Sequence, residues 1–278
     1  MSNLFEFRPV AQSTLRRWSR PARFDFLDDL AFVPIADTEL LHLSHYAPIG
    51  IRLGRHGPEV VAILHSELNI GRLLGKEGRW LPPYAPYALR CLPFRGVGPE
   101  AMPEIAEALC SAEGEQFPLL GEDGQPGKDY AYVIEMLRRL ARGSLRLANA
   151  AKLLLAADCL VALYPLESQP EAMVYVVSET LLQRFSGAQA AALTTDSNLP
   201  YEIAAASLFS QRLLRRGAVQ DLPTPAPSRM VAPAMDQGHR PMIQDFQGSF
   251  EEPLMMDDST LFSIDDFLEF SDKADERS

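Results

Sequence analysis

The sequence predicts an α+β fold, in which a β-rich N-terminal half packs with C-terminal helices and is followed by a disordered linker and an acidic tail. Between residues 30 and 120, short apolar runs rich in branched side chains are separated by Gly, Pro and His, as in strands joined by turns. From about residue 128 to 163, apolar residues recur with the helical period. Beyond residue 220 the chain is rich in proline and weakly apolar, which is typical of an extended linker.

The strands are expected at apolar runs that are too short for typical helices. These runs lie at residues 31–35, 48–53, 59–64 and 173–177. Glycine-containing sequences at residues 76–79 and 121–124 predict tight turns, because glycine accepts the positive φ that such turns require. We therefore expect a hairpin or strand connection at each of them.

Three helical segments are expected in the second half of the chain. The longest covers residues 128–163, and the Gly-Ser pair at 143–144 is expected to kink or split it. Ser178 is a candidate N-cap for a short helix. A further helix is expected at residues 200–216, where Gly217 would act as the stop signal.

The sequence pattern divides the chain into four parts. They are an N-terminal arm (residues 1–24), a folded α+β domain (25–219), a Pro-rich disordered linker (220–250) and an acidic amphipathic tail (251–278). The hydrophobic fraction of 47% is ordinary for a globular protein, so the domain requires no external crosslinks. The three cysteines have no CxxC spacing, and we expect them to be small buried side chains outside any disulfide or zinc site.

The negative charge of the chain is concentrated at its C-terminal end. Of a formal net charge of −11, the segment from Glu251 onward holds −8, with ten acids against two bases, which leaves about −3 for the remainder. An acidic total disfavours nonspecific nucleic-acid binding, which requires Lys and Arg to neutralise phosphates. The N-terminus lacks the features of a secretory signal, and no apolar run reaches the roughly 18 residues of a membrane span. We expect a cytoplasmic protein with no membrane insertion and no nucleic-acid partner.

The acidic tail contains a candidate docking helix. Ser263 can cap this helix and two aspartates fall in its first turn, while four apolar residues line one face: Leu261, Ile264, Phe267 and Leu268. Burying four such side chains yields roughly 6–12 kcal/mol, whereas ordering about eight residues costs roughly 8–16 kcal/mol. The helix is therefore expected to form only against a protein partner. The alternative is a disordered tail that only solubilises the chain.

A series of short motifs runs through the β-rich half. They are VPI at residues 33–35, Glu39, HYAPI at 45–49, VAIL at 61–64, Asn69, GRW at 78–80, YAP at 84–86, RCLPF at 90–94 and EDGQP at 122–126. In order and spacing they resemble the SapC family of bacterial proteins, which is named for a surface-layer-associated member. The resemblance covers roughly residues 25–217 and is weaker in the helical part. It implies a surface-layer or cell-surface accessory role, for a family without established catalytic residues.

A first candidate ligand site combines carboxylate and imidazole groups. If Asp37 caps a short helix, Glu39 lies on one face with His42, and His45 lies at the edge of that face. Such a set suits a divalent metal, and His65 is a candidate further ligand. The alternative is that these histidines are ordinary polar positions at a turn.

A second candidate site is a groove formed by aromatic residues. Trp80, Tyr84 and Tyr87 lie in a proline-rich stretch, and rigid flat side chains bind peptides or sugars at a small entropic cost. The alternative is that Trp80 fills the core.

Basic side chains gather on two of the expected helices. They are Arg138, Arg139, Arg142 and Arg146 on one, and Arg212, Arg215 and Arg216 at the end of the other. A run of charge is usually a solvated face. Alternatively, the acids of the tail settle on the basic face until a partner displaces them, in weak and salt-sensitive pairs.

The sequence contains no GxSxG elbow, HExxH motif, P-loop or complete dinucleotide loop. We therefore expect a non-enzymatic accessory or interaction protein that has a protein partner and no cofactor. The alternative is a metal-dependent enzyme that uses the Glu39 and histidine set. The sequence leaves the oligomeric state open.

Overall fold

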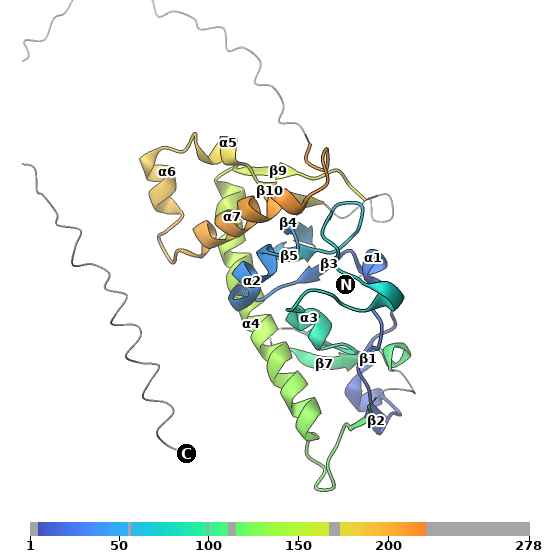
Figure 1. Ribbon diagram of the computed structural model, residues 1–278. Coiled ribbons are helices and arrows are strands. Elements are labelled where there is room, and N and C mark those ends of the chain that lie inside the picture. Colours follow the sequence, from blue (N-terminus) through green and yellow to red (C-terminus); the bar gives the residue numbers. More distant parts are fainter. Residues whose placement is uncertain (1–4, 55–56, 99, 111–114, 167–172, 221–278) are drawn as a thin grey trace, which may run out of the picture. The chain divides into compact units, whose positions relative to one another are not determined.

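A five-stranded antiparallel sheet organises the larger part of the fold (Figure 1). The computed structural model describes residues 5–54, 57–98, 100–110, 115–166 and 173–220. Across the sheet the strands are β3 (Phe32–Pro34), β5 (Gly57–Ile63), β4 (Ile49–Gly54), β10 (Val174–Val177) and β9 (Leu160–Ala162). The strands predicted at 31–35, 48–53, 59–64 and 173–177 are confirmed. The predicted tail and nearly all of the predicted linker lie outside the described residues.

The five-stranded sheet is buried on both faces. In β5, Val60 and Ala62 pack into the core on one face, whereas Val61 and Ile63 pack into a separate core on the other. Successive side chains of a strand point to opposite faces, so a strand covered on both sides needs apolar residues at every position. This requirement explains why the sequence shows unbroken apolar runs here.

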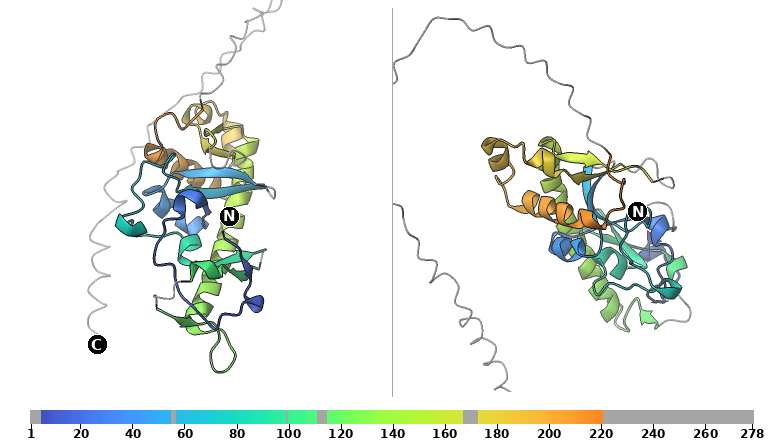
Figure 2. Two further views of the ribbon diagram at one scale, coloured as in Figure 1. Left: turned by 90° about the vertical axis from the view of Figure 1, so that its right-hand side faces the viewer. Right: turned by 45° about the horizontal axis from the view of Figure 1, so that its top comes forward.

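Helices cover one face of this sheet (Figure 2). The long helix α4 (Lys128–Ala156) packs on β5, α7 (Leu199–Ser210) packs on β4 and β10, and α2 (Leu40–Ser44) packs on α7. Leu147 and Leu154 of α4 are fully buried in the core on this face.

The N-terminal half of α4 belongs to a different core. A three-stranded sheet contains β1 (Arg8–Pro9), β7 (Met102–Ile105) and β6 (Phe94–Val97) in that order, and β2 (Arg17–Trp18) pairs with β8 (Phe117–Pro118). Trp18 is fully buried, with its ring centroid 4.9 Å from that of Phe94, and Val133 of α4 packs in the same core. Within residues 5–24, which we expected to belong to an arm, β2 thus contributes the buried Trp18 to this core.

The remaining helices are short. They are α1 (Leu27–Leu30), α3 (Tyr87–Arg90), α5 (Glu179–Leu182), α6 (Gly187–Ala192) and the 3-10 helices η1 (Val10–Gln12), η2 (Asp37–Glu39), η3 (Lys76–Gly78), η4 (Glu107–Leu109) and η5 (Gln211–Leu213). The predicted cap of α5 is confirmed, because Ser178 Oγ accepts a hydrogen bond from the backbone N–H of Leu181 at 3.4 Å.

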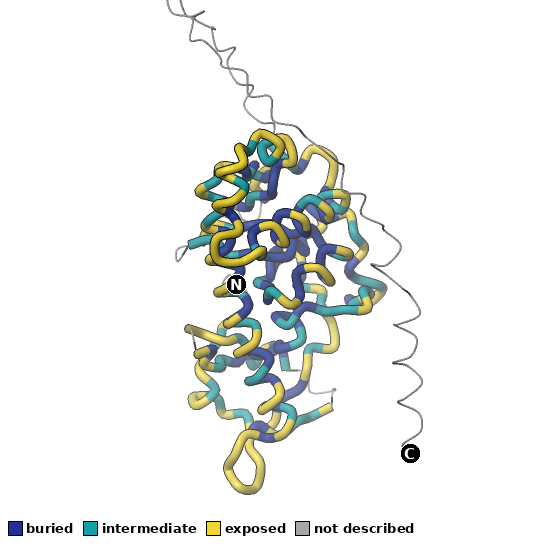
Figure 3. Tube along the Cα trace, turned by 90° about the vertical axis from the view of Figure 1, so that its left-hand side faces the viewer, coloured by how far each residue is buried: buried dark blue, intermediate teal, exposed yellow. Residues whose placement is uncertain are grey.

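The two predicted turns are confirmed by single β-bridges. Leu74 pairs with Trp80 across the first turn, and Leu120 pairs with Pro126 across the second. The second turn is an exposed loop between β8 and α4 (Figure 3).

Two helix boundaries differ from the prediction. The first helix ends at Ala156 and not at 163, because Asp158 adopts a left-handed φ of 53° and the chain then enters β9. The second ends at Ser210 and not at 216. There the Ser210 hydroxyl accepts a hydrogen bond from the backbone N–H of Ile49. Further along the chain, the backbone N–H of Arg215 donates a hydrogen bond to the backbone oxygen of Leu68.

The predicted kink at residues 143–144 is wrong, because α4 runs through them as one helix. Gly143 instead allows the backbone of α4 to lie close to the chain at Ala36 and Asp37. A Cβ at this position would lie 2.6 Å from the Cβ of Ala36 and 2.7 Å from an Oδ1 of Asp37. The glycine therefore lets α4 touch the backbone between β3 and η2.

Candidate functional site

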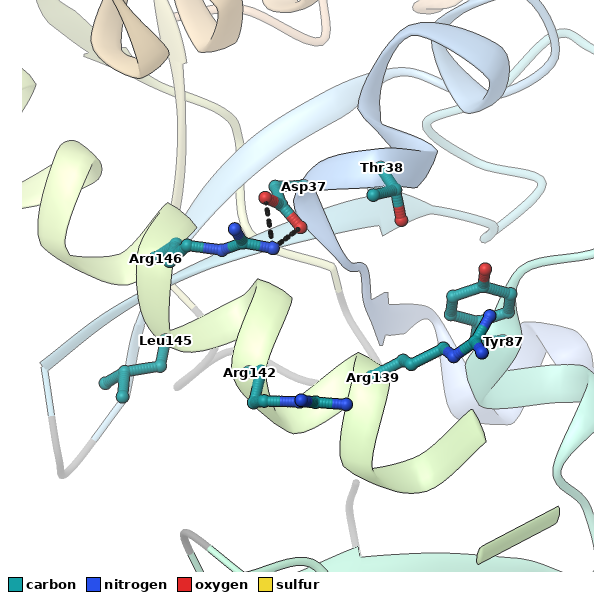
Figure 4. A pocket seen from close by; sticks show the side chains of 7 residues that line it. All are labelled: Asp37, Thr38, Tyr87, Arg139, Arg142, Leu145 and Arg146. Carbon is teal, nitrogen blue, oxygen red and sulfur yellow. Dashed lines mark hydrogen bonds and ion pairs between the residues drawn. The ribbon is translucent and has the colours of Figure 1, made fainter. Parts of the chain in front are cut away.

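An open hollow of about 490 Å³ lies beside α4 and contains three arginine side chains. The hollow is bordered by three elements, which are α4, η2 and the start of α3. We call it the arginine pocket, and it is lined by Asp37, Thr38, Tyr87, Arg139, Arg142, Leu145 and Arg146 (Figure 4).

The helical period of α4 brings the three arginines to one side. Arg139, Arg142 and Arg146 are spaced by three and four residues, and residues at these spacings are neighbours on a helix surface. All three side chains are more than half exposed, whereas Leu147 on the neighbouring face is fully buried in the core. The amphipathic pattern that packs α4 on the core therefore also presents Arg139, Arg142 and Arg146 to solvent, and we call these three residues the basic stripe.

The close contact at Gly143 places η2 against the basic stripe. The next residue, Ser144, donates its hydroxyl hydrogen to the backbone oxygen of Ile35 at 2.8 Å. With the two backbones held together, the carboxylate of Asp37 lies 2.7 Å from the guanidinium of Arg146. Asp37 is therefore the first residue of η2 and an ion-pair partner, and not the helix cap that the metal-site hypothesis assumed.

The buried residue Glu39 holds together the two segments, η2 and the start of α3, that face α4 across the pocket. Its side chain has an exposed fraction of 0%, and its carboxylate accepts hydrogen bonds from the backbone N–H of Ala36 (2.9 Å), the hydroxyl of Tyr84 (2.9 Å) and the backbone N–H of Tyr87 (2.6 Å). Burial raises the pKa of Glu39 above its ordinary value, against the opposing effect of these three donors. The network ties η2 to the start of α3 and thereby positions Tyr87.

Aromatic rings and a fourth arginine extend this side of the pocket. The guanidinium of Arg90 lies 5.4 Å from the ring centroid of Tyr87 and 6.0 Å from that of Tyr84, within cation–π range. Burial, followed by the nearby charge of Glu39, raises the pKa of the Tyr84 hydroxyl. In Figure 4 the guanidinium of Arg139 lies beside the ring of Tyr87.

The arginine pocket has an excess of positive charge. Arg139 and Arg142 both pair with Glu135, at 3.1 and 3.4 Å, and Arg146 pairs with Asp37. Three guanidinium groups therefore share two carboxylates. Arginine binds carboxylates and phosphates through two parallel hydrogen bonds, so the pocket is chemically suited to bind an acidic group.

The structure does not assemble the predicted metal ligands. Glu39 faces inward, whereas the exposed ring of His42 stacks on Tyr84 with centroids 5.7 Å apart, and His45 packs against Phe209 at 4.9 Å. The side chain of His65, buried elsewhere, accepts the backbone N–H of Glu67 through Nδ1 at 3.1 Å. Among the residues that the structure describes, no three His, Cys, Asp or Glu side chains form a group that could hold a metal ion.

The three aromatic residues of the predicted groove take separate roles. Trp80 is partly buried, packs against the main core and donates its indole N–H to the backbone oxygen of Tyr84 at 3.2 Å. Tyr84 donates its hydroxyl hydrogen to Glu39. Of the three, only Tyr87 lines the arginine pocket.

Sequence reasoning found the basic stripe on α4 but not the pocket beside it. The stripe follows from helical spacing alone, whereas Asp37, Thr38 and Tyr87 come from segments far away in the sequence. Gly143 was the available signal, because a glycine inside a strong helical pattern often marks a close approach of another backbone.

Comparison with known proteins identifies the family. The model of the SapC family matches residues 14–216, which is most of the chain. The chain belongs to the SapC family. The matched segment of this SapC protein contains every residue that lines the arginine pocket, and it ends before the acidic tail.

A search of the curated proteins and a search of the solved structures find no match to this SapC protein. Within the described parts of the chain, every helix is too short or too polar to span a bilayer.

Proposed function

We propose that this SapC protein is a non-enzymatic accessory or interaction protein that binds an acidic segment of a partner protein in the arginine pocket. The arginine pocket carries the proposal, because it combines three arginines, two hydroxyl-bearing residues and an excess of positive charge in one open hollow. A hollow of this kind offers binding groups for an acid.

The biological setting of this binding is proposed from the family alone. The SapC family is named for a surface-layer-associated member, which supports a role in surface-layer or surface-protein assembly. We propose in addition that the acidic tail is a second docking element, in which Leu261, Ile264, Phe267 and Leu268 contact a protein partner. The tail sequence supports this second step through its apolar face and its flanking acids.

The experiment for the pocket compares an arginine that lines the pocket with an exposed arginine outside it. Arg142 lines the pocket, whereas the exposed Arg184 lies in the segment after α5. Binding of a fluorescein-labelled octaglutamate peptide to the full chain would be followed by fluorescence anisotropy. We expect Arg142→Gln to weaken binding about 10- to 100-fold, as for the loss of one charge-assisted hydrogen bond. Arg184→Gln removes the same charge and should change the affinity less than 2-fold. Equal effects of the two substitutions, or no binding to the unmodified chain, would contradict the proposal.

A further inference from the structure

A second hollow, of about 400 Å³, lies on the other side of the same stretch of α4. It shares Arg142 and Leu145 with the arginine pocket, so these two side chains form a ridge between the hollows. Apart from the ridge, its lining is mostly apolar or small and includes Pro34, Gly96, Leu137, Leu140, Ala141 and Ser144. We call it the apolar hollow.

Acidic and apolar groups would find different surroundings on the two sides of the ridge. The arginine pocket offers guanidinium groups, whereas the acid that borders the apolar hollow, Glu59, forms an ion pair with Arg52. An apolar side chain that leaves water for the apolar hollow gains roughly 10- to 100-fold in affinity if it is fully buried. The ridge residue Leu145 is itself 59% exposed and is available to be covered.

The two hollows are close enough for one short peptide. Neighbouring side chains on a helix surface lie about 5–6 Å apart. Two residues of extended chain span about 7 Å. A peptide that crosses the ridge can therefore place an acid on one side and an apolar side chain, two or three residues away, on the other.

We infer that the ligand of this site is an acidic-apolar peptide segment of a partner protein, bound across the Arg142–Leu145 ridge with its carboxylates in the arginine pocket and a Phe or Leu side chain in the apolar hollow. This inference rests on the proposed function and adds the second subsite to it. Charge complementarity selects the acids, and the lining of the apolar hollow selects the neighbouring side chain.

The test uses two labelled octapeptides that differ at one position. Both carry two adjacent glutamates, and two residues later the first has phenylalanine where the second has serine. The protein is the full chain with Asp265→Asn and Asp266→Asn, which weakens its own acidic-apolar segment as a competitor. We expect the phenylalanine peptide to bind about 10-fold more tightly than the serine peptide.

Two substitutions of equally exposed leucines provide the matched control. Leu145 and Leu41 are both 59% exposed, but only Leu145 borders the two hollows. Leu145→Ala should reduce the 10-fold preference to about 3-fold or less, and Leu41→Ala should leave it unchanged. If both peptides bind with equal affinity to the protein in which Leu145 is intact, the apolar subsite is refuted while the arginine pocket stands. If neither peptide binds, the proposed function fails as well.

Discussion

Replacing Gly143 by alanine sets two physical effects against each other. In the interior of a helix, alanine is favoured over glycine by about 0.8–1.0 kcal/mol, so helix propensity alone predicts that the substitution stabilises α4. The packing predicts the opposite, because the new Cβ would lie 2.6 Å from Ala36 Cβ and 2.9 Å from Ala36 Cα. Ala36 is fully buried and has no rotatable side chain, so only a backbone shift can relieve the contact.

The size of the clash can be isolated with a second glycine. Gly187 in α6 has no atom within 4 Å of an added Cβ, so Gly187→Ala should stabilise the protein by about 0.4–1 kcal/mol. Overpacking of a buried site costs about 1–3 kcal/mol. The free energy of unfolding of Gly143→Ala should therefore be lower than that of Gly187→Ala by about 1–3 kcal/mol.

Urea denaturation followed by tryptophan fluorescence measures this difference. Gly143→Ala should also weaken the binding of an acidic peptide in the arginine pocket. A backbone shift at residues 36–37 would separate Asp37 from Arg146 and change the position of η2. A Gly143→Ala protein that is as stable as Gly187→Ala would refute the argument that Gly143 permits a close backbone approach.

Three further predictions concern buried polar groups. Tyr84→Phe removes a hydrogen bond to Glu39 and should lower the free energy of unfolding by about 1.5–3 kcal/mol in urea. Burial raises the pKa of Glu39 above 4.5, so the folded state favours the protonated carboxyl. Its contribution to the free energy of unfolding is fully present below that pH and is lost as the pH rises through the folded-state pKa. Glu39→Gln should abolish this part of the pH dependence of stability. Iodoacetamide should label half-buried Cys110 before Cys91 and Cys159, whose pKa values burial raises to about 12 and about 11, as peptide mass mapping would show.

Each of these predictions has an outcome that contradicts it. The control for Tyr84→Phe is Tyr164→Phe at an exposed tyrosine, which should change stability by less than about 0.5 kcal/mol, and equal losses would remove the role of the hydrogen bond. A pH profile that is unchanged by Glu39→Gln would mean that this carboxyl binds its proton equally in both states. Early labelling of Cys91 would show that its core opens readily.

The strands were predictable because their signal is local. A sheet covered on both faces requires apolar residues at consecutive positions, and the run from Val60 to Ile63 meets that requirement by itself. The cap at Ser178 is equally local, since donor and acceptor are three residues apart. For these elements the local residue pattern is sufficient for the prediction, even where the pairing partner of a strand is distant, as Val174 is from Arg52.

The roles of Glu39 and Gly143 were not predictable, because their partners are distant in the sequence. Glu39 resembles a metal ligand when only His42 and His45 are considered, but Tyr84 and Tyr87 supply two of its three hydrogen bonds from 45 and 48 residues away. A glycine in a helix indicates either a weak point or a close contact, and only the fold distinguishes them. The basic stripe was predictable because its arginines are three and four residues apart on one helix. The arginine pocket was not, because its other lining residues come from distant segments of the sequence.

The long helix α4 is anchored in two separate cores, through Val133 and Leu137 near one end and Leu147 and Leu154 near the other. Inserting or deleting a single residue between the anchors would turn one end by about 100° relative to the other. The number of residues between them therefore cannot drift during evolution without rebuilding one core. The outward-facing side chains on the same turns carry no such constraint, so natural variants can exchange them one at a time while both cores stay unchanged.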